Sequence, residues 1–251
     1  LIIQQRGELG GKHGGRVGQR AAADVFQQAE VALFLAGHEV MNEHRAARGD
    51  GFMHGGTAGF ADDEVVAGVV GRLVREKGLG ELFAALHELR PDHPQLRLVV
   101  VGPQDPDKPD GLSAEAIAEA EELGVIFTGM RHDMPECYAG MDLFVTATYR
   151  EGFPRAAMEA SASGLPLVAT DIRGCRQVVE HGVTGLLVPV RDSAGLAAAI
   201  AELATGPHLR ARMGAAAQAK ARRDFDQQRV IEITLEAYER EWSQRAPRRR
   251  R

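Results

Sequence analysis

Cysteine is scarce in this 251-residue chain, and its scarcity excludes two common ways of stabilising a fold. Cys137 and Cys175 lie far apart and form no Cys-x-x-Cys pair, so neither a disulfide framework nor a structural zinc site is expected. Such usage is typical of a reducing compartment, and the sequence therefore predicts a cytoplasmic protein. Both residues are expected to be ordinary small side chains rather than nucleophiles.

Long apolar runs and an excess of positive charge are also missing. No apolar run approaches the roughly 18 residues that a membrane-spanning helix needs. The N-terminus has no basic start before its apolar residues, so a signal peptide is not predicted. The formal net charge of -5 argues against a general nucleic-acid binder. The first residue is Leu rather than Met, which is consistent with a piece of a longer chain.

The usual signatures of nucleotide and metal binding are absent as well. The stretch around "GGKH" is not a P-loop, because Arg6 stands where the first Gly would be and His13 replaces Ser or Thr. No dinucleotide glycine fingerprint follows the first expected strand, and no helical His pair has supporting ligands. Asp105 and Asp107 form an Asp-x-Asp pair in a Pro-rich loop without a strand immediately before it, so no metal site is predicted.

Two parts of different character remain. Residues 1–63 are an irregular segment of unclear origin, since residues 1–60 hold 12 of the 29 glycines and show no series of strands. One candidate helix lies there, over residues 21–47, and an independent folded core is not expected. Residues 64–245 are regular, and residues 246–251 form a basic tail.

The regular part alternates apolar, β-branched runs with amphipathic segments. Strands are expected at 65–71, 96–102, 125–129, 142–148, 165–171 and 184–190. Helices are expected at 79–90, 113–124, 133–140, 175–182, 193–206, 207–222 and 226–244, with one more after residue 152. Such alternation predicts an α/β fold, a doubly wound, Rossmann-like parallel sheet covered on both faces. Its ligand is expected beyond the carboxyl ends of the strands.

The loop after the first expected strand carries two cations. Gly71 allows the chain to turn and lets a ligand approach the backbone, and Arg72 and Lys77 follow it. A guanidinium fork and a mobile ammonium together match the charge of a diphosphate. Two solvated basic residues in a surface loop are the alternative, and this stretch alone favours that alternative.

The stretch "EGFPRAAMEA", residues 151–160, places two carboxylates around the start of a helix. The helix is expected to begin at Phe153 or Pro154, because proline suits the first helical position. Its free amide donors would then converge on an anion; they belong to Gly152, Phe153, Arg155 and Ala156.

Glu151 and Glu159 would flank that anion. Glu159 lies roughly 8 Å along the helix from its start, which is the scale of a ribose beside a diphosphate. A carboxylate can accept hydrogen bonds from both ribose hydroxyls, and Glu151 could do the same for a group on the other side. The pair therefore fits a nucleotide sugar held across a helix N-terminus. The alternative for each residue is a surface charge.

Several of these motifs occur together and in order. "VVGRLVREKGL" and the run from "VIFTGMRHDMPECYAG" through "GFPRAAMEASASGLPLVATDIRGCRQVVEHGVTGLLVPVRD" resemble the C-terminal domain of GT-B glycosyltransferases of family four, also called glycosyl transferases group one. The resemblance covers about residues 65–245. It implies the C-terminal half of a GT-B fold and a retaining, metal-independent hexosyltransferase that needs no cofactor beyond its nucleotide-sugar donor.

The resemblance also implies roles for individual residues. Arg72 and Lys77 would hold the diphosphate, with backbone contacts from the loop at Gly71 and from Gly152 and Phe153. Glu151 would contact the donor sugar and, with the two cations, form the catalytic group. Glu159 would bind the ribose, and Met130 and Arg131 would lie near the base. A UDP-sugar is favoured over a GDP-sugar.

The subfamily motifs most resemble enzymes that build cell-surface polysaccharides, some of them on lipid-linked saccharide acceptors. A location at the inner face of the membrane follows from that resemblance. Trp242 and the tail "RAPRRRR" offer a peripheral contact with anionic lipid, although a plain solvated tail is the stronger interpretation.

The chain also departs from the family. Residues 1–60 do not resemble the acceptor-binding domain, the usual Asn-Gly-Val-Asp stretch is missing, and Gln177 stands where many relatives carry Glu. One alternative is therefore a non-catalytic nucleotide-sugar-binding fragment that lacks its acceptor domain and is inactive alone. Another is a nucleotide-sugar epimerase of the same architecture.

Overall fold

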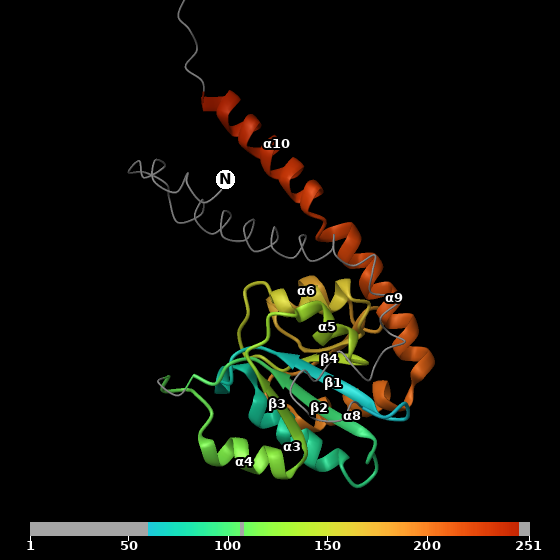
Figure 1. Ribbon diagram of the computed structural model, residues 1–251. Coiled ribbons are helices and arrows are strands. Elements are labelled where there is room, and N and C mark those ends of the chain that lie inside the picture. Colours follow the sequence, from blue (N-terminus) through green and yellow to red (C-terminus); the bar gives the residue numbers. More distant parts are fainter. Residues whose placement is uncertain (1–59, 106–107, 246–251) are drawn as a thin grey trace, which may run out of the picture.

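The computed structural model describes residues 60–105 and 108–245. The expectations for residues 1–59 and for the tail 246–251 lie outside this range. The described chain forms one parallel six-stranded sheet with helices on both faces (Figure 1). The strands are β1 (Val65–Val70), β2 (Leu96–Val101), β3 (Val125–Gly129), β4 (Leu143–Thr146), β5 (Leu167–Thr170) and β6 (Gly185–Val188).

The helices follow the strands in the expected alternation. They are η3 (Arg75–Lys77), α3 (Leu79–Leu89), α4 (Ala114–Glu122), α5 (Met134–Ala139), α6 (Arg155–Ala162), α7 (Arg173–Val178), α8 (Ser193–Thr205), α9 (Pro207–Asp224) and α10 (Gln227–Arg245). The short 3-10 helix η3 is the one element that the sequence pattern did not predict within the described range. The predicted α/β, doubly wound fold is confirmed.

The order of the strands is β3-β2-β1-β4-β5-β6. Val65 of β1 pairs with Leu96 of β2, and on the other edge Ala67 pairs with Leu143 of β4, both in parallel. Successive connections run outward in one direction from β1 and in the other direction from β4. The connections that follow β1 and β4 therefore run in opposite directions along the sheet, and open α/β sheets bind ligands in the crevice at the point where the strand order reverses.

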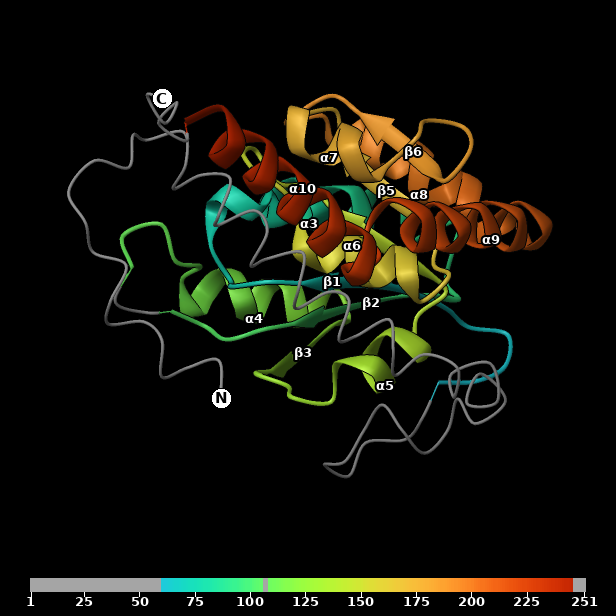
Figure 2. The ribbon, with the colours of Figure 1, turned by 90° about the horizontal axis from the view of Figure 1, so that it is seen from above.

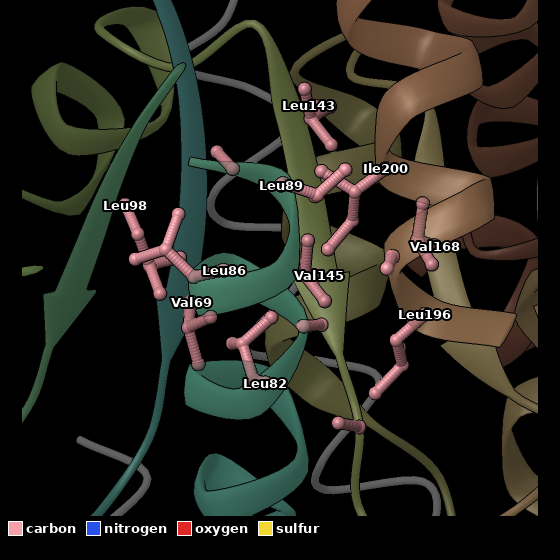
Figure 3. Close-up of a cluster of buried hydrophobic side chains, with 14 of the residues drawn as sticks. Val69, Leu82, Leu86, Leu89, Leu98, Leu143, Val145, Val168, Leu196 and Ile200 are labelled. Atoms are coloured by element: carbon pink, nitrogen blue, oxygen red, sulfur yellow. The ribbon is translucent and has the colours of Figure 1, made fainter. Parts of the chain in front are cut away.

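Two hydrophobic clusters fasten the helices to the two faces of the sheet. On one face, α3 and α8 pack against strand residues such as Val69, Leu98 and Val145 (Figure 3). On the other face, α5, α6, α7 and α9 surround residues such as Phe144 and Leu167. Figure 1 shows α5 and α6 on one side of the sheet and α3 and α8 on the other, and Figure 2 views the molecule from the side of α6. Because β-branched and leucine side chains alternate to both faces of each strand, both faces need cover.

Helices α9 and α10 complete the described chain. Helix α9 packs on α6 and α8, whereas α10 continues beyond the sheet (Figure 1). Helix α10 exposes large apolar side chains, and Trp242 is 80% exposed. Within the described ranges, no helix combines the length and apolarity that crossing a membrane requires.

Candidate functional site

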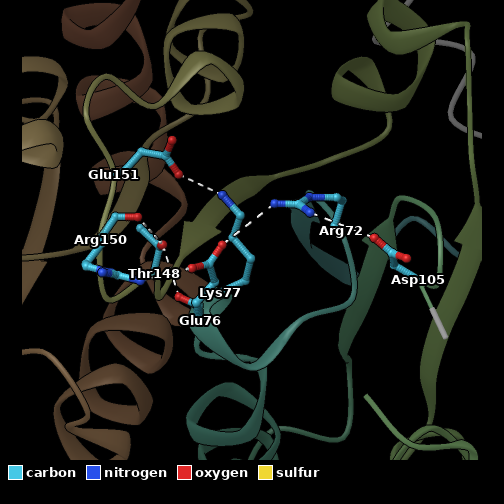
Figure 4. A network of polar contacts seen from close by, with 7 residues as sticks. All are labelled: Arg72, Glu76, Lys77, Asp105, Thr148, Arg150 and Glu151. Carbon is cyan, nitrogen blue, oxygen red and sulfur yellow. Dashed lines mark hydrogen bonds and ion pairs between the residues drawn. The ribbon is translucent and has the colours of Figure 1, made fainter. Parts of the chain in front are cut away.

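The loops after β1 and β4 meet at the reversal of strand order. The first loop runs through Arg72 and η3 to Lys77, and the second runs from Ala147 to the start of α6. The ammonium of Lys77 donates a hydrogen bond of 2.7 Å to the Glu151 carboxylate (Figure 4). Both side chains are about one quarter exposed, at 25% and 24%, so a ligand can reach the pair. Two residues that the sequence assigned to one site are thus in direct contact.

Arg72 lies on the same loop, between two carboxylates. Its guanidinium is 3.7 Å from Glu76 and 3.8 Å from Asp105, and its side chain is 42% exposed. These separations exceed those of hydrogen bonds, so the guanidinium can still donate to a phosphate. Figure 4 shows the Arg72 guanidinium directed from the β1 loop toward the side on which Lys77 and Glu151 lie.

Asp105, the first residue of the Asp-x-Asp pair, therefore lies against a cation. Asp107 lies outside the described residues. Across the described ranges, no group of three or more His, Cys, Asp or Glu side chains is arranged to hold a metal ion.

The start of α6 differs from the prediction. The helix begins at Arg155, and Pro154 is the N-cap residue with φ -75° and ψ 97°, rather than the first helical residue. Proline fits this place because its fixed φ suits both an extended and a helical neighbour. The helix thus starts one or two residues later than predicted, and its first amides are those of Arg155, Ala156 and Ala157, of which Arg155 and Ala156 were predicted.

Two packing contacts fix the position of the loop before α6. The Phe153 ring packs edge-on against Phe225 at a centroid distance of 5.6 Å. A Cβ added to Gly174, in α7, would lie 2.3 Å from the carbonyl oxygen of Glu151. Only glycine permits this approach, which sets α7 directly against the backbone of the Glu151 loop. Gly152 is exposed at the surface of that loop.

Glu159 is not a surface charge. It is 7% exposed, and its carboxylate accepts hydrogen bonds from the Tyr138 hydroxyl at 2.8 Å and from Arg155 Nε at 3.0 Å. Tyr138 belongs to α5 and is fully buried; burial first, and then the neighbouring Glu159 charge, raise the pKa of its hydroxyl well above the usual range. No pattern in the sequence predicts the role of Tyr138, because Tyr138 and Glu159 are 21 positions apart on different helices.

The residues expected near the base follow β3. Met130 is 61% exposed, and Arg131 forms an ion pair with Asp133 in which Nε donates to the carboxylate at 2.7 Å. Both therefore lie on the same carboxyl edge of the sheet as the cations, at the end of β3, which β2 and β1 separate from β4.

A second group of residues borders the site and was missed by the sequence analysis. Tyr149, which follows β4, donates its hydroxyl to Glu81 at 2.6 Å, and the guanidinium of Arg191 lies 4.7 Å from the centre of its ring. Tyr149 and Arg191, with Glu76, Arg150 and Val190, line a hollow of about 530 Å³. Arg191 has φ 63°, the one positive φ of a non-glycine residue among the described residues. A positive φ outside glycine has no reliable pattern in sequence.

Cys137 and Cys175 are both buried. Burial raises the pKa of each thiol to about 11, with the Asp133 charge adding to the effect at Cys137. Each side chain is therefore a neutral thiol near pH 7, as expected of an ordinary small residue.

Fold and site together define a Rossmann-like lobe of the GT-B class, with its polar groups at the reversal of strand order. The chain belongs to the family described as "Glycosyl transferases group 1", which matches residues 57–220.

Named relatives support this membership. The chain is 36% identical over 172 residues to the glycogen synthase of Mycobacterium tuberculosis, which covers 67% of this chain and 41% of the relative. It is 35% identical to the D-inositol 3-phosphate glycosyltransferase of Corynebacterium jeikeium, covering 69% of this chain and 43% of that protein. The chain thus spans less than half the length of these curated relatives.

A solved structure agrees with the fold. Anabaena Alr3699/HepE in complex with UDP and glucose is similar with a TM-score of 0.61 and 29% identity, covering 70% of this chain and 48% of that one.

Proposed function

We propose that the site between the β1 and β4 loops binds the diphosphate and sugar of a nucleotide-sugar donor. The observation that carries the proposal is the 2.7 Å contact between Lys77 and Glu151, which joins a cation for phosphate to a carboxylate for sugar hydroxyls. The complex of Alr3699/HepE with UDP and glucose supports the ligand class. In this proposal a UDP-sugar is the preferred donor.

Each site residue then has a role. Arg72 and Lys77 hold the diphosphate from the β1 side, and the backbone of Gly152 and Phe153 faces it from the α6 side. Glu151 binds hydroxyls of the transferred sugar. Glu159 accepts from the ribose, with its carboxylate fixed by the Tyr138 hydroxyl at 2.8 Å. Met130 and Arg131, at the end of β3, contact the base.

The reaction we infer is transfer of a hexose to an acceptor hydroxyl with retention of anomeric configuration. The bond from the sugar to the phosphate oxygen breaks, and its electron pair leaves with the diphosphate. A bond from the sugar to the acceptor oxygen forms, and the proton of the acceptor hydroxyl passes to the departing diphosphate. Arg72 and Lys77 would stabilise the charge that develops on the leaving diphosphate, in place of a metal ion. Glu151, which binds hydroxyls of the transferred sugar, would be the third catalytic residue.

The biological product we propose is a cell-surface polysaccharide, assembled on a lipid-linked saccharide at the inner face of the membrane. Trp242 on α10 is 80% exposed and is the described residue best placed for a peripheral contact with lipid. This extension rests on the order of motifs in the sequence.

A second candidate is binding of the donor without transfer. It is favoured by the placement of every proposed donor contact between residues 71 and 159, on one sheet domain. Such a domain can bind the donor alone, whereas transfer also needs an acceptor held in near-attack geometry.

The proposal is tested with Glu151→Ala and, as a matched control, Glu122→Ala at the exposed end of α4. Glu151→Ala is expected to weaken UDP-glucose roughly tenfold or more and UDP much less, because the lost hydrogen bonds go to the sugar. Glu122→Ala should change neither. Equal losses for UDP and UDP-glucose in Glu151→Ala would remove the sugar assignment.

Product analysis separates the candidate reactions. The chain is incubated with UDP-sugars, with and without a panel of lipid-linked acceptors, and products are read by mass spectrometry and NMR. Multiple-turnover transfer with an unchanged anomeric configuration supports the transferase, and binding without product supports the second candidate. A sugar epimerised in the absence of acceptor would contradict both.

A further inference from the structure

A buried hydroxyl lies between the two loops that carry Lys77 and Glu151. Thr148, just beyond β4, is fully buried, and its Oγ1 is 3.2 Å from the carbonyl oxygen of Glu76 and 3.1 Å from that of Arg150 (Figure 4). The first carbonyl belongs to the residue before Lys77, and the second to the residue before Glu151. One hydroxyl proton is therefore shared between the backbones of both loops.

The surrounding contacts fix this arrangement. The Tyr149 amide also donates to the Glu76 carbonyl, at 2.9 Å. From β5, the Thr170 hydroxyl donates to the Thr148 carbonyl at 2.6 Å, and Thr170 is itself fully buried. The Thr148 and Thr170 hydroxyls are thus the side-chain members of a polar cluster at the carboxyl ends of β4 and β5.

We propose that Thr148 is a positioning residue, whose hydroxyl sets the separation of the Lys77 ammonium and the Glu151 carboxylate for the ligand. The inference rests on the proposed function, because it deepens the account of the same site. Replacing the hydroxyl by a methyl group removes its contacts to both carbonyls. The Glu76 carbonyl keeps the Tyr149 amide as a donor, whereas the Arg150 carbonyl loses the Thr148 hydroxyl, so the segment that carries Glu151 can shift relative to Lys77.

A purely structural role for Thr148 predicts a different result. In that case its loss would lower stability and weaken every part of the ligand alike. A positioning role weakens the diphosphate and sugar but leaves the nucleoside unaffected, because Met130, Arg131 and Glu159 belong to other elements. The ratio of UDP affinity to uridine affinity therefore separates the two roles.

Thr184 provides a matched control. It is buried to the same degree, and its hydroxyl oxygen accepts a hydrogen bond from the Glu180 amide at 2.8 Å. It lies just before β6, at the amino edge of the sheet, away from the proposed site. Thr184→Val should lower stability as Thr148→Val does, without changing the affinity ratio.

The experiment compares the parent chain with Thr148→Val, Thr148→Ser and Thr184→Val, using calorimetry for UDP and ligand-observed NMR for uridine. Thr148→Val is expected to weaken UDP by roughly three- to tenfold, the effect of one net hydrogen bond, with uridine unchanged. Thr148→Ser keeps the hydroxyl and should restore UDP affinity. An unchanged affinity ratio in folded Thr148→Val, or no restoration by serine, would overturn the inference.

Two further outcomes are distinguishable. If Thr148→Val does not fold, Thr170→Val tests the same cluster through the 2.6 Å bond to the Thr148 carbonyl, and the same change in ratio is expected. Unchanged UDP affinity in that variant would then count against positioning. Failure of the parent chain to bind UDP at all would refute the proposed function, and the inference with it.

Discussion

At the scale of single residues, the two glutamates of "EGFPRAAMEA" have different surroundings. Glu151 is reachable from solvent and contacts Lys77, whereas Glu159 is 7% exposed and contacts Tyr138 and Arg155. A buried carboxylate is costly unless its oxygens are satisfied, and here a tyrosine hydroxyl and a guanidinium satisfy them. The side chain is thus held in one place before any ligand arrives, which suits a fixed acceptor for ribose hydroxyls.

This arrangement predicts the behaviour of Glu159→Gln. The amide keeps the shape of the side chain but loses its charge, so UDP affinity should fall by about tenfold or more, as expected for hydrogen bonds to a charged group. The loss should vanish when 2′,3′-dideoxy-UDP is titrated, because that analogue has no hydroxyls to donate. Calorimetry of both nucleotides provides the measurement. If the variant weakens the dideoxy nucleotide as strongly as UDP, Glu159 does not bind the ribose.

At the scale of elements, the β1 loop is pressed against the β4 loop, and Gly78 is where they meet. It ends η3 and begins α3 with φ 68°, and a Cβ there would lie 2.1 Å from the Ala147 carbonyl oxygen. Glycine alone satisfies both the left-handed conformation and the close approach. The contact is between backbones, so no side-chain adjustment relieves it.

Gly78→Ala should therefore lower the free energy of unfolding by about 1–3 kcal/mol, the cost of a strained conformation, and weaken UDP as the loops separate. Gly80→Ala, two residues along in α3, meets nothing within 4 Å and is the control. It should be neutral or stabilise by up to about 1 kcal/mol. Urea denaturation with and without UDP measures both. Equal stability of the two variants would show that the loop contact is not as described.

Sequence periodicity predicted the elements but not their junctions. Every strand and every α-helix predicted between residues 64 and 245 is present, because buried β-branched runs and capped amphipathic segments have strong patterns. The start of α6 was placed too early, since proline is compatible with both the N-cap and the first turn. Tyr138 and Thr148 were missed because their partners lie far away in sequence, and only the sheet order brings them together.

At the scale of the whole molecule, the strand order places the proposed site. In the described sheet, β1 and β4 are the only two neighbouring strands whose following connections run in opposite directions. Arg72, Lys77 and Glu151 all belong to the loops that follow these two strands. The match to the glycosyl transferases group 1 family, over residues 57–220, includes all three of these residues. Helix α10, beyond the sheet, contributes no residue to this proposed site.

The most direct test of the account is calorimetric titration of UDP and uridine into the parent chain, Arg72→Ala and Lys77→Ala. Each substitution removes a cation proposed to hold the diphosphate, and Arg97→Ala, on a distant ion pair with Glu64, is the control. We expect both site variants to lose roughly 1.5–3 kcal/mol of UDP binding, with uridine unchanged and the control unaffected. Equal losses for UDP and uridine, or no loss in either site variant, would contradict a diphosphate site between β1 and β4.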